Sequence, residues 1–538
     1  MKLNDKKKRL GGAAGVIRFA SLGRREGTYV KPVSLVRRLH GDGEDMVSAG
    51  WSERSYHGTD ADSAAVPAVG RGQHVLLIAA HFAPESTSGT HRSLHFARAL
   101  KEAGFMVSVV TVNRDSLTVV DEHLNSVFPY EDQILRVPLR PTLETTYLAC
   151  KKPWTQLVER IRGSSPGEHV RRENEQGRIV RRRNPIRQEL SGAISFPDRY
   201  RGWYRPAIEA AERLALKAPV HAVFASGPPW TALMAAFAVS QRLHCKLITD
   251  FRDPWTWRMG CIDTDRPKLC STWAERHENR IIARSSAVLF NSPDLLSNSR
   301  RNVENLPASV YCILNGTDMP ARARVRDFPT SGRLRIRHLG SLYGGRSVAP
   351  LLSAIAASDI DPSRITIELI GPADCESALS GGDLSRSEVI RRPVMPHSDA
   401  ARLMDEPAVL LAVQSRNFSA QIPTKLYEYL RTGNPILVLA AHDSAAWRIA
   451  SQYERCYRLD FEDTAGNALI MQRLFNRWSG GQLAQVPASD TASFGKARIG
   501  REFASLVSTL LKDDPRAGQL LRPPPQSQIW PNPGMVSR

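Results

Sequence analysis

From residue 73 onward, short apolar runs alternate with stretches in which apolar residues recur at helical spacing. The first run, His74–Ala80, is almost continuously apolar, as expected for a strand that is covered on both faces of a sheet. A small-residue loop, Pro84–Gly89, leads into an expected helix over 90–103, and Val107–Val112 follows as the next strand. This order predicts a β-α-β unit with two parallel strands and a right-handed connection.

The same alternation continues through two series of elements. The first series predicts a helix over 231–243 and further strands at Ala222–Ala225, Lys246–Asp250, Ala287–Asn291 and Val310–Leu314. After a polar stretch at 319–333, a second series predicts strands and helices at Arg335–Gly340, Ser347–Ala357, Ile365–Ile370, Val409–Val413, Lys425–Thr432 and Ile436–Ala440. We therefore expect an α/β protein with two Rossmann-like doubly wound domains that face each other across a cleft, hinged near 315–330. Ligands of such sheets bind at the carboxyl ends of the strands, so the cleft is the expected site.

These patterns divide the chain into four expected parts. Residues 1–72, which lack sustained apolar periodicity, are expected to form a disordered basic leader, and whether they belong to the native protein stays open. Residues 73–318 form the expected first, acceptor-side domain, with a basic insertion at about 151–190. Residues 319–512 form the expected second, donor-binding domain, and the Pro-rich segment 513–538 is expected to be a tail.

Composition places the bulk of the chain among ordinary globular proteins, because 42% of its 538 residues are hydrophobic and 24% are charged. The 73 Lys and Arg residues outnumber 54 Asp and Glu residues, which gives a formal net charge of +19. Part of this excess lies in the stretch Lys151–Arg187. Such a stretch attracts nucleic acid, anionic lipid or acidic substrates. No helix-turn-helix, zinc-finger or RNP-like pattern accompanies it, so nucleic acid is disfavoured, whereas a solvated insertion and a membrane contact both stay open.

Signals for secretion, membrane insertion and metal binding are weak. No apolar run approaches the ~18 residues of a membrane span, and the basic start at Lys6–Arg9 precedes an apolar run that arginines soon interrupt. The 7 cysteines are dispersed without a C-x-x-C spacing, which predicts reduced thiols in the cytosol and disfavours zinc. Asp263 and Asp265 have a D-x-D spacing but lie in a polar stretch, so no bound metal is expected.

Two segments of the second half have the features of a phosphate site. Gly340–Arg346 places a glycine-rich loop and an arginine between a strand and a helix, which allows close backbone approach and supplies a permanent charge for a diphosphate. A plain turn is the alternative. In Ile422–Leu430, Thr424 is a candidate cap and Lys425 is a cation at a helix start, where a bound anion would explain it. Glu428 lies one turn later and is a candidate for the hydroxyls of a ribose, although a salt-bridged amphipathic helix stays open.

Two segments of the first half also follow predicted strands. The loop Pro84–Arg92 enters a helix and offers backbone N–H groups to a phosphate or sugar, although many such loops bind nothing. The segment Thr249–Trp255 puts Asp250, Arg252 and Asp253 next to a buried strand. For Arg252, a structural pairing with either aspartate and a catalytic role both stay open.

These segments together resemble the family 4 glycosyltransferases of the GT-B fold. The likeness rests on His74–Thr111, Ala225–Trp255, Gly340–Arg346 and Pro423–Pro435, and it covers roughly residues 73–512 without the basic insertion. It is greatest for bacterial members with a D-F-R-D-P-W loop and a K-L-x-E-Y-L-x-x-G-x-P-I segment. Several ordered motifs at plausible separations make it more specific than any single motif.

The resemblance implies a retaining transferase that uses a nucleotide-activated sugar, UDP- or GDP-linked, as its substrate, with no metal and no other cofactor. The position of Arg346 would contact the donor diphosphate, and that of Glu428 the donor ribose. The loop around Gly89 and the strand end at Gly340 would lie near the diphosphate and sugar. The loop that ends at Pro396 would hold the base.

One departure from the family pattern bears on sugar recognition. Most members have a glutamate eight residues before the second one, and here that position is Ala420. Lys425 belongs to the branch that lacks this first glutamate, and it is assigned here to both donor binding and catalysis. The usual histidine is not evident, and Arg252 and Asp253 occupy roughly its place as the remaining catalytic candidates.

The expected function is therefore transfer of a hexosyl or N-acetylhexosaminyl group to a cell-surface glycan or a lipid-linked acceptor. The protein is expected in the cytoplasm, peripherally attached to the inner face of the membrane through an anionic lipid surface. A nucleotide-sugar epimerase of the same fold is the first alternative, and it requires a set of carboxylates and histidines in the cleft. A noncatalytic basic binding protein is the second alternative.

Overall fold

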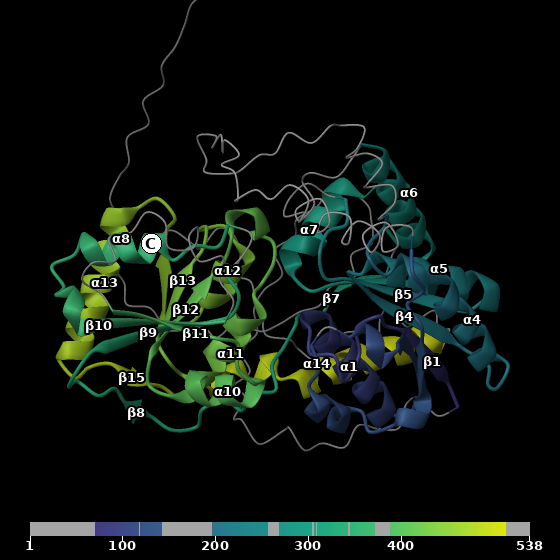
Figure 1. Cartoon of the computed structure of the whole chain (residues 1–538), viewed down its shortest axis with the longest axis horizontal. Coiled ribbons are helices and arrows are strands. Elements are labelled where there is room, and N and C mark those ends of the chain that lie inside the picture. The colour runs from purple at the N-terminus through teal and green to yellow at the C-terminus, as the bar shows by residue number, and fades with distance from the viewer. Residues whose placement is uncertain are drawn as a thin grey trace, which may run out of the picture.

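The computed structural model describes residues 70, 72–117, 119–142, 196–256, 268–303, 306–307, 309–342, 345–371 and 388–512. These residues form two α/β domains, with the first on the right of Figure 1 and the second on the left. Most of the expected leader, the basic stretch Lys151–Arg187, the pair Asp263 and Asp265, and the expected tail lie outside the described residues.

The first domain is built on a parallel sheet with the strand order β3-β2-β1-β4-β5-β6-β7. Its strands are β1 (His74–Ile78), β2 (Met106–Val112), β3 (Ile134–Val137), β4 (Ala222–Gly227), β5 (Lys246–Phe251), β6 (Ala287–Phe290) and β7 (Val310–Cys312). Its helices are α1 (Ser88–Glu102), α4 (Tyr204–Ala215), α5 (Trp230–Leu243), α6 (Lys268–Arg284) and α7 (Pro293–Asn302).

Both faces of this sheet are buried, as the continuous apolar runs predict. Successive side chains of a strand point to opposite faces. Leu76 and Ile78 of β1 accordingly belong to one core, which they share with α4 and α5, whereas Val75 and Leu77 belong to a second core with α1. The sheet is therefore doubly wound.

The second domain repeats this architecture with the parallel order β11-β10-β9-β12-β13-β14. Its strands are β9 (Leu334–Leu339), β10 (Ile365–Ile370), β11 (Glu388–Arg392), β12 (Val409–Val413), β13 (Ile436–Leu439) and β14 (Cys456–Leu459). Its helices are α8 (Ala349–Ala356), α10 (His397–Asp405), α11 (Thr424–Thr432), α12 (Ala445–Ala450) and α13 (Thr464–Ser479). A short antiparallel pair joins β8 (Arg326–Asp327) to β15 (Ala484–Gln485).

The last helix, α14 (Lys496–Leu511), crosses back onto the first domain and lies beside α1 (Figure 1). The Phe503 ring stacks on that of Phe96 with 4.0 Å between their centroids. A Cβ added at Gly500 would come within 2.6 Å of the Ala99 Cβ, so the helices approach closely because this position is glycine. The sequence assigns α14 to the range of the second domain, yet it completes the core of the first.

The chain consequently passes between the domains twice. The first passage includes Thr317 and the second includes Gly495, and the two segments lie side by side. The backbone N–H of Thr317 donates to the Phe494 carbonyl at 2.9 Å, and that of Lys496 donates to the Thr317 carbonyl at 3.2 Å. The connection between the domains is therefore a hydrogen-bonded pair of segments.

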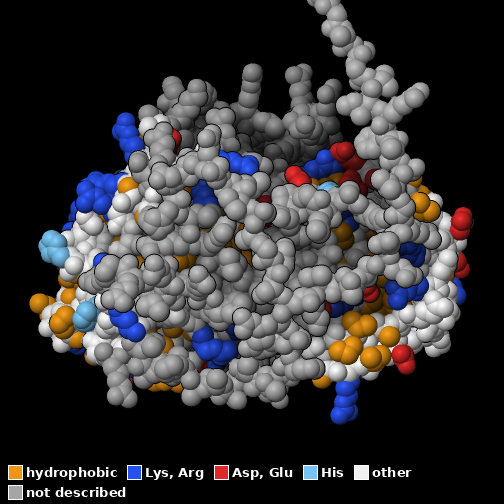
Figure 2. Space-filling view, turned by 180° about the vertical axis from the view of Figure 1, so that it is seen from behind, with side chains coloured by type: hydrophobic (Ala, Val, Ile, Leu, Met, Phe, Trp, Pro, Cys, Tyr) orange, Lys and Arg blue, Asp and Glu red, His pale blue; other side chains and the backbone are white. Residues whose placement is uncertain are grey.

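The predicted fold class, two Rossmann-like doubly wound domains facing each other across a cleft, is confirmed. No helix among the described residues is long and apolar enough to cross a membrane. On the face opposite to that of Figure 1, the visible Lys and Arg side chains are dispersed over the described surface and do not gather in one patch (Figure 2).

Candidate functional site

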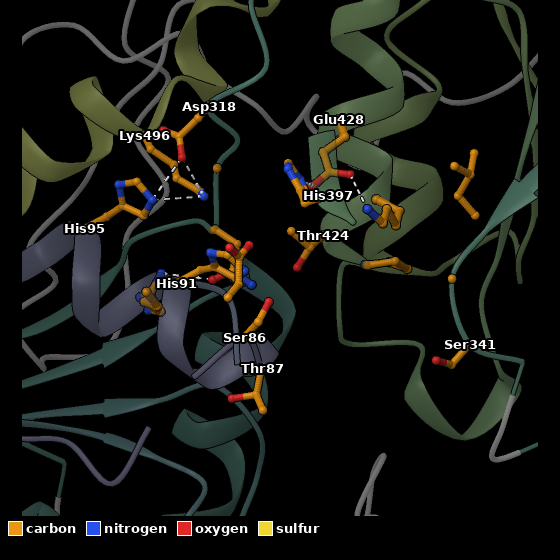
Figure 3. A pocket seen from close by; sticks show the side chains of 18 of the residues that line it. Ser86, Thr87, His91, His95, Asp318, Ser341, His397, Thr424, Glu428 and Lys496 are labelled. Carbon is orange, nitrogen blue, oxygen red and sulfur yellow. Dashed lines mark hydrogen bonds and ion pairs between the residues drawn. The ribbon is translucent and has the colours of Figure 1, made fainter. Parts of the chain in front are cut away.

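A cleft of about 1480 Å³ lies between the domains and is lined by residues from both of them. Pockets for a single small ligand commonly measure roughly 300–1,000 Å³, so this cleft has room for more than one. It lies at the carboxyl ends of the parallel strands, where doubly wound sheets bind ligands. Figure 3 shows side chains from α1, from the connecting segments and from the second domain pointing into it.

Two of the predicted donor-site cations, Arg346 and Lys425, line the cleft together with residues at the end of β9. Gly340, which directly follows β9, has a positive φ of 146° that disfavours other residues. Burial, together with the positive charges of Arg346 and Lys425, lowers the pKa of His338 to about 4. His338, Gly340, Arg346 and Lys425 all line the cleft.

Lys425 forms an ion pair within the first turn of α11. Its Nζ lies 2.6 Å from Oε2 of Glu428, and Nε2 of His397 lies 3.4 Å from the other carboxylate oxygen. Burial alone would raise the pKa of Glu428, but the hydrogen bond from His397 and the charge of Lys425 outweigh it and lower the pKa to about 2. The salt-bridged helix that the sequence left open is thus present. Thr424 is the first residue of α11, and Pro423 occupies the cap position instead.

The loop between β11 and α10 forms another part of the second domain's wall. Val394, Met395 and Pro396 line the cleft, and the Val394 side chain is 70% exposed. Pro396 is the cap residue of α10, which places His397 in the first turn, where it faces Glu428. An exposed apolar loop beside an ionised carboxylate is compatible with the predicted base and ribose subsites.

In the first domain, Asp250 pairs with an arginine that the sequence did not suggest. Arg92 of α1 donates two hydrogen bonds of 2.8 Å to the buried Asp250 carboxylate. Its Nη1 also donates to the Leu314 carbonyl at 3.0 Å and to the Asn315 side chain at 3.2 Å. Arg92 therefore ties α1 to β5 and to the first connecting segment, and the hydrogen-bonded arginine of Asp250 is Arg92 and not Arg252.

Arg252 and Asp253 extend beyond β5 and line the cleft. The Arg252 guanidinium donates to the Pro228 carbonyl, and burial lowers its pKa. A Cβ at Gly89 would come within 3.2 Å of this guanidinium and within 2.9 Å of the His81 ring. Gly89 therefore allows α1 to approach Arg252, and Gly89 is not among the described residues that line the cleft. Burial raises the pKa of Asp253 despite the neighbouring charge of Arg252.

Several histidines of the cleft were missed. His91 and His95 lie on one face of α1, and the sequence signal was their spacing of four residues within a predicted helix. His95 Nε2 and Lys496 Nζ each lie 2.9 Å from Oδ2 of Asp318 (Figure 3). Burial would raise the pKa of Asp318, but these two partners hold it well below its usual range.

His91 faces the second domain across the cleft. Its ring centroid lies 6.4 Å from that of His397 (Figure 3). Burial, followed by the charge of Lys496, lowers the pKa of His91 to about 3, so the ring is neutral near pH 7. The cleft thus holds neutral imidazole, ionised carboxylate and fixed cations.

The structure therefore divides the predicted site residues between two walls. Gly340, Arg346, Pro396, Lys425 and Glu428 lie on the second domain's wall, and Arg252 and Asp253 lie on the first domain's wall. No group of three or more His, Cys, Asp or Glu side chains that could hold a metal ion occurs within the described ranges.

No protein-family model matches the sequence, and no curated protein is similar to it. Among solved structures, sucrose-phosphate synthase from Thermosynechococcus elongatus is similar over 84% of this chain and 98% of its own, with 14% identity and a TM-score of 0.48. Anabaena HepE in complex with UDP and glucose matches over 82% of this chain and all of its own, with 12% identity and a TM-score of 0.49. WaaG, a glycosyltransferase involved in lipopolysaccharide biosynthesis, matches over 84% of this chain with 11% identity and a TM-score of 0.44. At these identities the likeness concerns the fold alone.

Proposed function

We propose that the protein is a glycosyltransferase that moves a sugar from a UDP- or GDP-linked donor to a glycan or lipid-linked acceptor. The observation that carries the proposal is that Arg346, Lys425 and Glu428 line one wall of a cleft between two domains, together with Gly340 at the end of a parallel strand. Two cations at one end of a parallel strand match the charge of a nucleoside diphosphate.

In this proposal the two cations stabilise the leaving diphosphate. Negative charge builds on the phosphate as the glycosidic bond breaks, and preorganised positive groups in a cleft stabilise that charge. Arg346 acts as a fixed guanidinium fork. Lys425 acts while it is held by Glu428, 2.6 Å away, so one α11 turn serves both the phosphate and the ribose.

The acceptor belongs to the first domain's wall, where Asp253 and Arg252 lie. Retention of configuration is part of the proposal and requires the acceptor oxygen to enter on the face that the phosphate leaves. Cell-envelope glycans are the proposed product class, and membership of family 4 is proposed on the quoted motifs.

A second candidate, an epimerase of the same fold, gains one observation from the structure. Such an enzyme needs carboxylates and histidines in the cleft, and His91, His397, Glu428 and Asp253 all line it. The transferase needs an acceptor, whereas the epimerase would convert the nucleotide sugar without one.

The deciding experiment incubates the purified chain with radiolabelled UDP- and GDP-sugars, with and without a lipid-linked glycan extract. The transferase proposal predicts that label enters the extract and that free nucleoside diphosphate forms. Conversion of the donor to an epimer without acceptor would favour the second candidate, and absence of any turnover or binding would reject both.

A further inference from the structure

The loop between β12 and α11 crosses from the second domain and contacts the first. Ala420 is buried in the core that lies on the α5 side of the first sheet. Its carbonyl accepts a hydrogen bond from the hydroxyl of Ser292, the residue that caps α7. Nearby, Arg448 of α12 lies 2.7 Å from Asp294. The position at which the sequence lacks a glutamate is thus part of a contact between the domains.

The same loop is held rigidly from within its own domain. Gln414 is buried, and its side-chain Nε2 donates to the carbonyls of Phe418 at 3.0 Å and Gln421 at 2.6 Å. The backbone N–H of Ala445 donates to the Ser419 carbonyl at 2.8 Å. These bonds fix the backbone of Gln421, so its side chain leaves the loop in a defined direction.

That side chain reaches Asp253 on the opposite wall. Gln421 Nε2 donates to Oδ1 of Asp253 at 2.7 Å, and both residues line the cleft. Among the described residues, the charged groups that act on Asp253 are Arg252 and Asp250, both from its own strand end. Gln421 therefore brings a hydrogen-bond donor from the second domain to this carboxylate. The bond requires the two domains to be in contact.

We infer that Gln421 is a positioning residue that orients Asp253 to accept a hydrogen bond from the acceptor hydroxyl when the domains are together. The inference rests on the proposed transferase function. An amide N–H donor satisfies Oδ1 and leaves Oδ2 for the sugar. Since a hydrogen bond to the charged form favours that form, Gln421 also opposes the effect of burial on Asp253. Separation of the domains would remove both effects.

The test compares Gln421→Ala, Gln421→Asn and Gln421→Glu with Arg448→Ala, a matched control that removes a different contact between the domains. Loss of a hydrogen bond to a charged group predicts that kcat/KM for the acceptor falls about ten-fold or more in Gln421→Ala. In the pH profile of kcat/KM, the acid limb of Gln421→Ala should lie at higher pH than that of the wild type. Donor binding, measured by thermal shift, should stay unchanged. Gln421→Asn should recover part of the loss. Gln421→Glu should regain activity as the pH falls, because a protonated carboxyl donates again.

A second readout needs no substrate. The carbon-13 signal of the Asp253 carboxyl, assigned with Asp253→Asn, should titrate at higher pH in Gln421→Ala than in the wild type or Arg448→Ala. The inference would be overturned if the Asp253 carboxyl titrates at the same pH in Gln421→Ala and Arg448→Ala and if the two variants have the same acid limb in their pH profiles of kcat/KM. A wild-type protein that titrates as expected but turns over no nucleotide sugar would instead contradict the proposed function.

Discussion

Arg346 and Lys425 are the two cations of the proposed donor site, and each has an identified neighbour. Arg346 stacks near Phe418, with 5.9 Å between its guanidinium carbon and the ring centroid. Lys425 is neutralised by Glu428 at a helix start, where an isolated cation is unfavourable. In the proposed donor site, the diphosphate would meet the permanent charge of Arg346 and the charge of Lys425, which is paired with Glu428.

Replacing either cation should weaken the use of the donor more than it weakens the fold. We expect Arg346→Ala and Lys425→Ala each to reduce kcat/KM for the donor by the equivalent of about 2–4 kcal/mol, the value of a charge-assisted contact in the transition state. Arg346→Lys should recover only part of this loss, because a planar fork becomes a point charge. Arg402→Ala, whose side chain is 77% exposed, is the control. Normal kinetics in both alanine variants would place the donor elsewhere.

Glu428 should make stability depend on pH in the acid range. Its pKa of about 2 in the folded protein lies below the ordinary 4.5, so its contribution is present above about pH 4.5 and is lost as the pH falls towards 2. Denaturant unfolding of wild type and Glu428→Gln should therefore differ at pH 6, on the order of 3 kcal/mol, and the difference should narrow at pH 3. A difference that is constant with pH would contradict the assigned ion pair.

At the scale of the elements, α14 is the last helix of the described residues, and it packs into the core of the first domain. Its Phe503 is fully buried against Phe96 and Phe224. Because the helix follows the second passage between the domains, its docking also fixes how the two walls of the cleft face each other.

Truncating Phe503 should consequently destabilise the first domain. Removal of a buried phenyl ring commonly costs about 3–5 kcal/mol, so Phe503→Ala should lower the denaturant midpoint of the first domain's transition. Ser505→Ala, on the exposed side of α14, is the matched control. Equal midpoints for the two variants would mean that α14 does not stabilise the first domain.

The sequence predicted the elements whose patterns are local. All strands expected from apolar runs are present, because a strand buried on both faces needs a continuous run. The edge strands β3, β11 and β14 were missed. The strand β11 (Glu388–Arg392) is partly exposed and mostly polar, so it lacks a continuous apolar run. The partner of Asp250 and the contact between Gln421 and Asp253 could not be predicted, because they join residues 158 and 168 positions apart. The apolar periodicity of α14 likewise does not indicate which domain the helix packs against.

For the whole molecule, we propose a peripheral attachment to an anionic membrane at its cytoplasmic face, because the net charge is +19 and the stretch Lys151–Arg187 is basic. Each basic residue near such a surface contributes about 1 kcal/mol, and the attraction declines beyond a Debye length of about 8 Å. We expect the intact chain to sediment with anionic liposomes at low salt, and a variant lacking residues 160–187 to bind less. Equal binding of the two proteins, or binding that is indifferent to salt, would reject the membrane contact.

The central claim is that a nucleotide sugar binds in the cleft through Arg346 and Lys425. Thermal unfolding of the wild-type chain, Arg346→Ala and Lys425→Ala against a panel of UDP- and GDP-sugars tests it most directly. A bound donor at about 100 times its Kd should add about 2.7 kcal/mol, so at least one compound should raise the wild-type Tm and raise it clearly less in both variants. If no compound raises the wild-type Tm, or if the variants respond as the wild type does, the claim is contradicted.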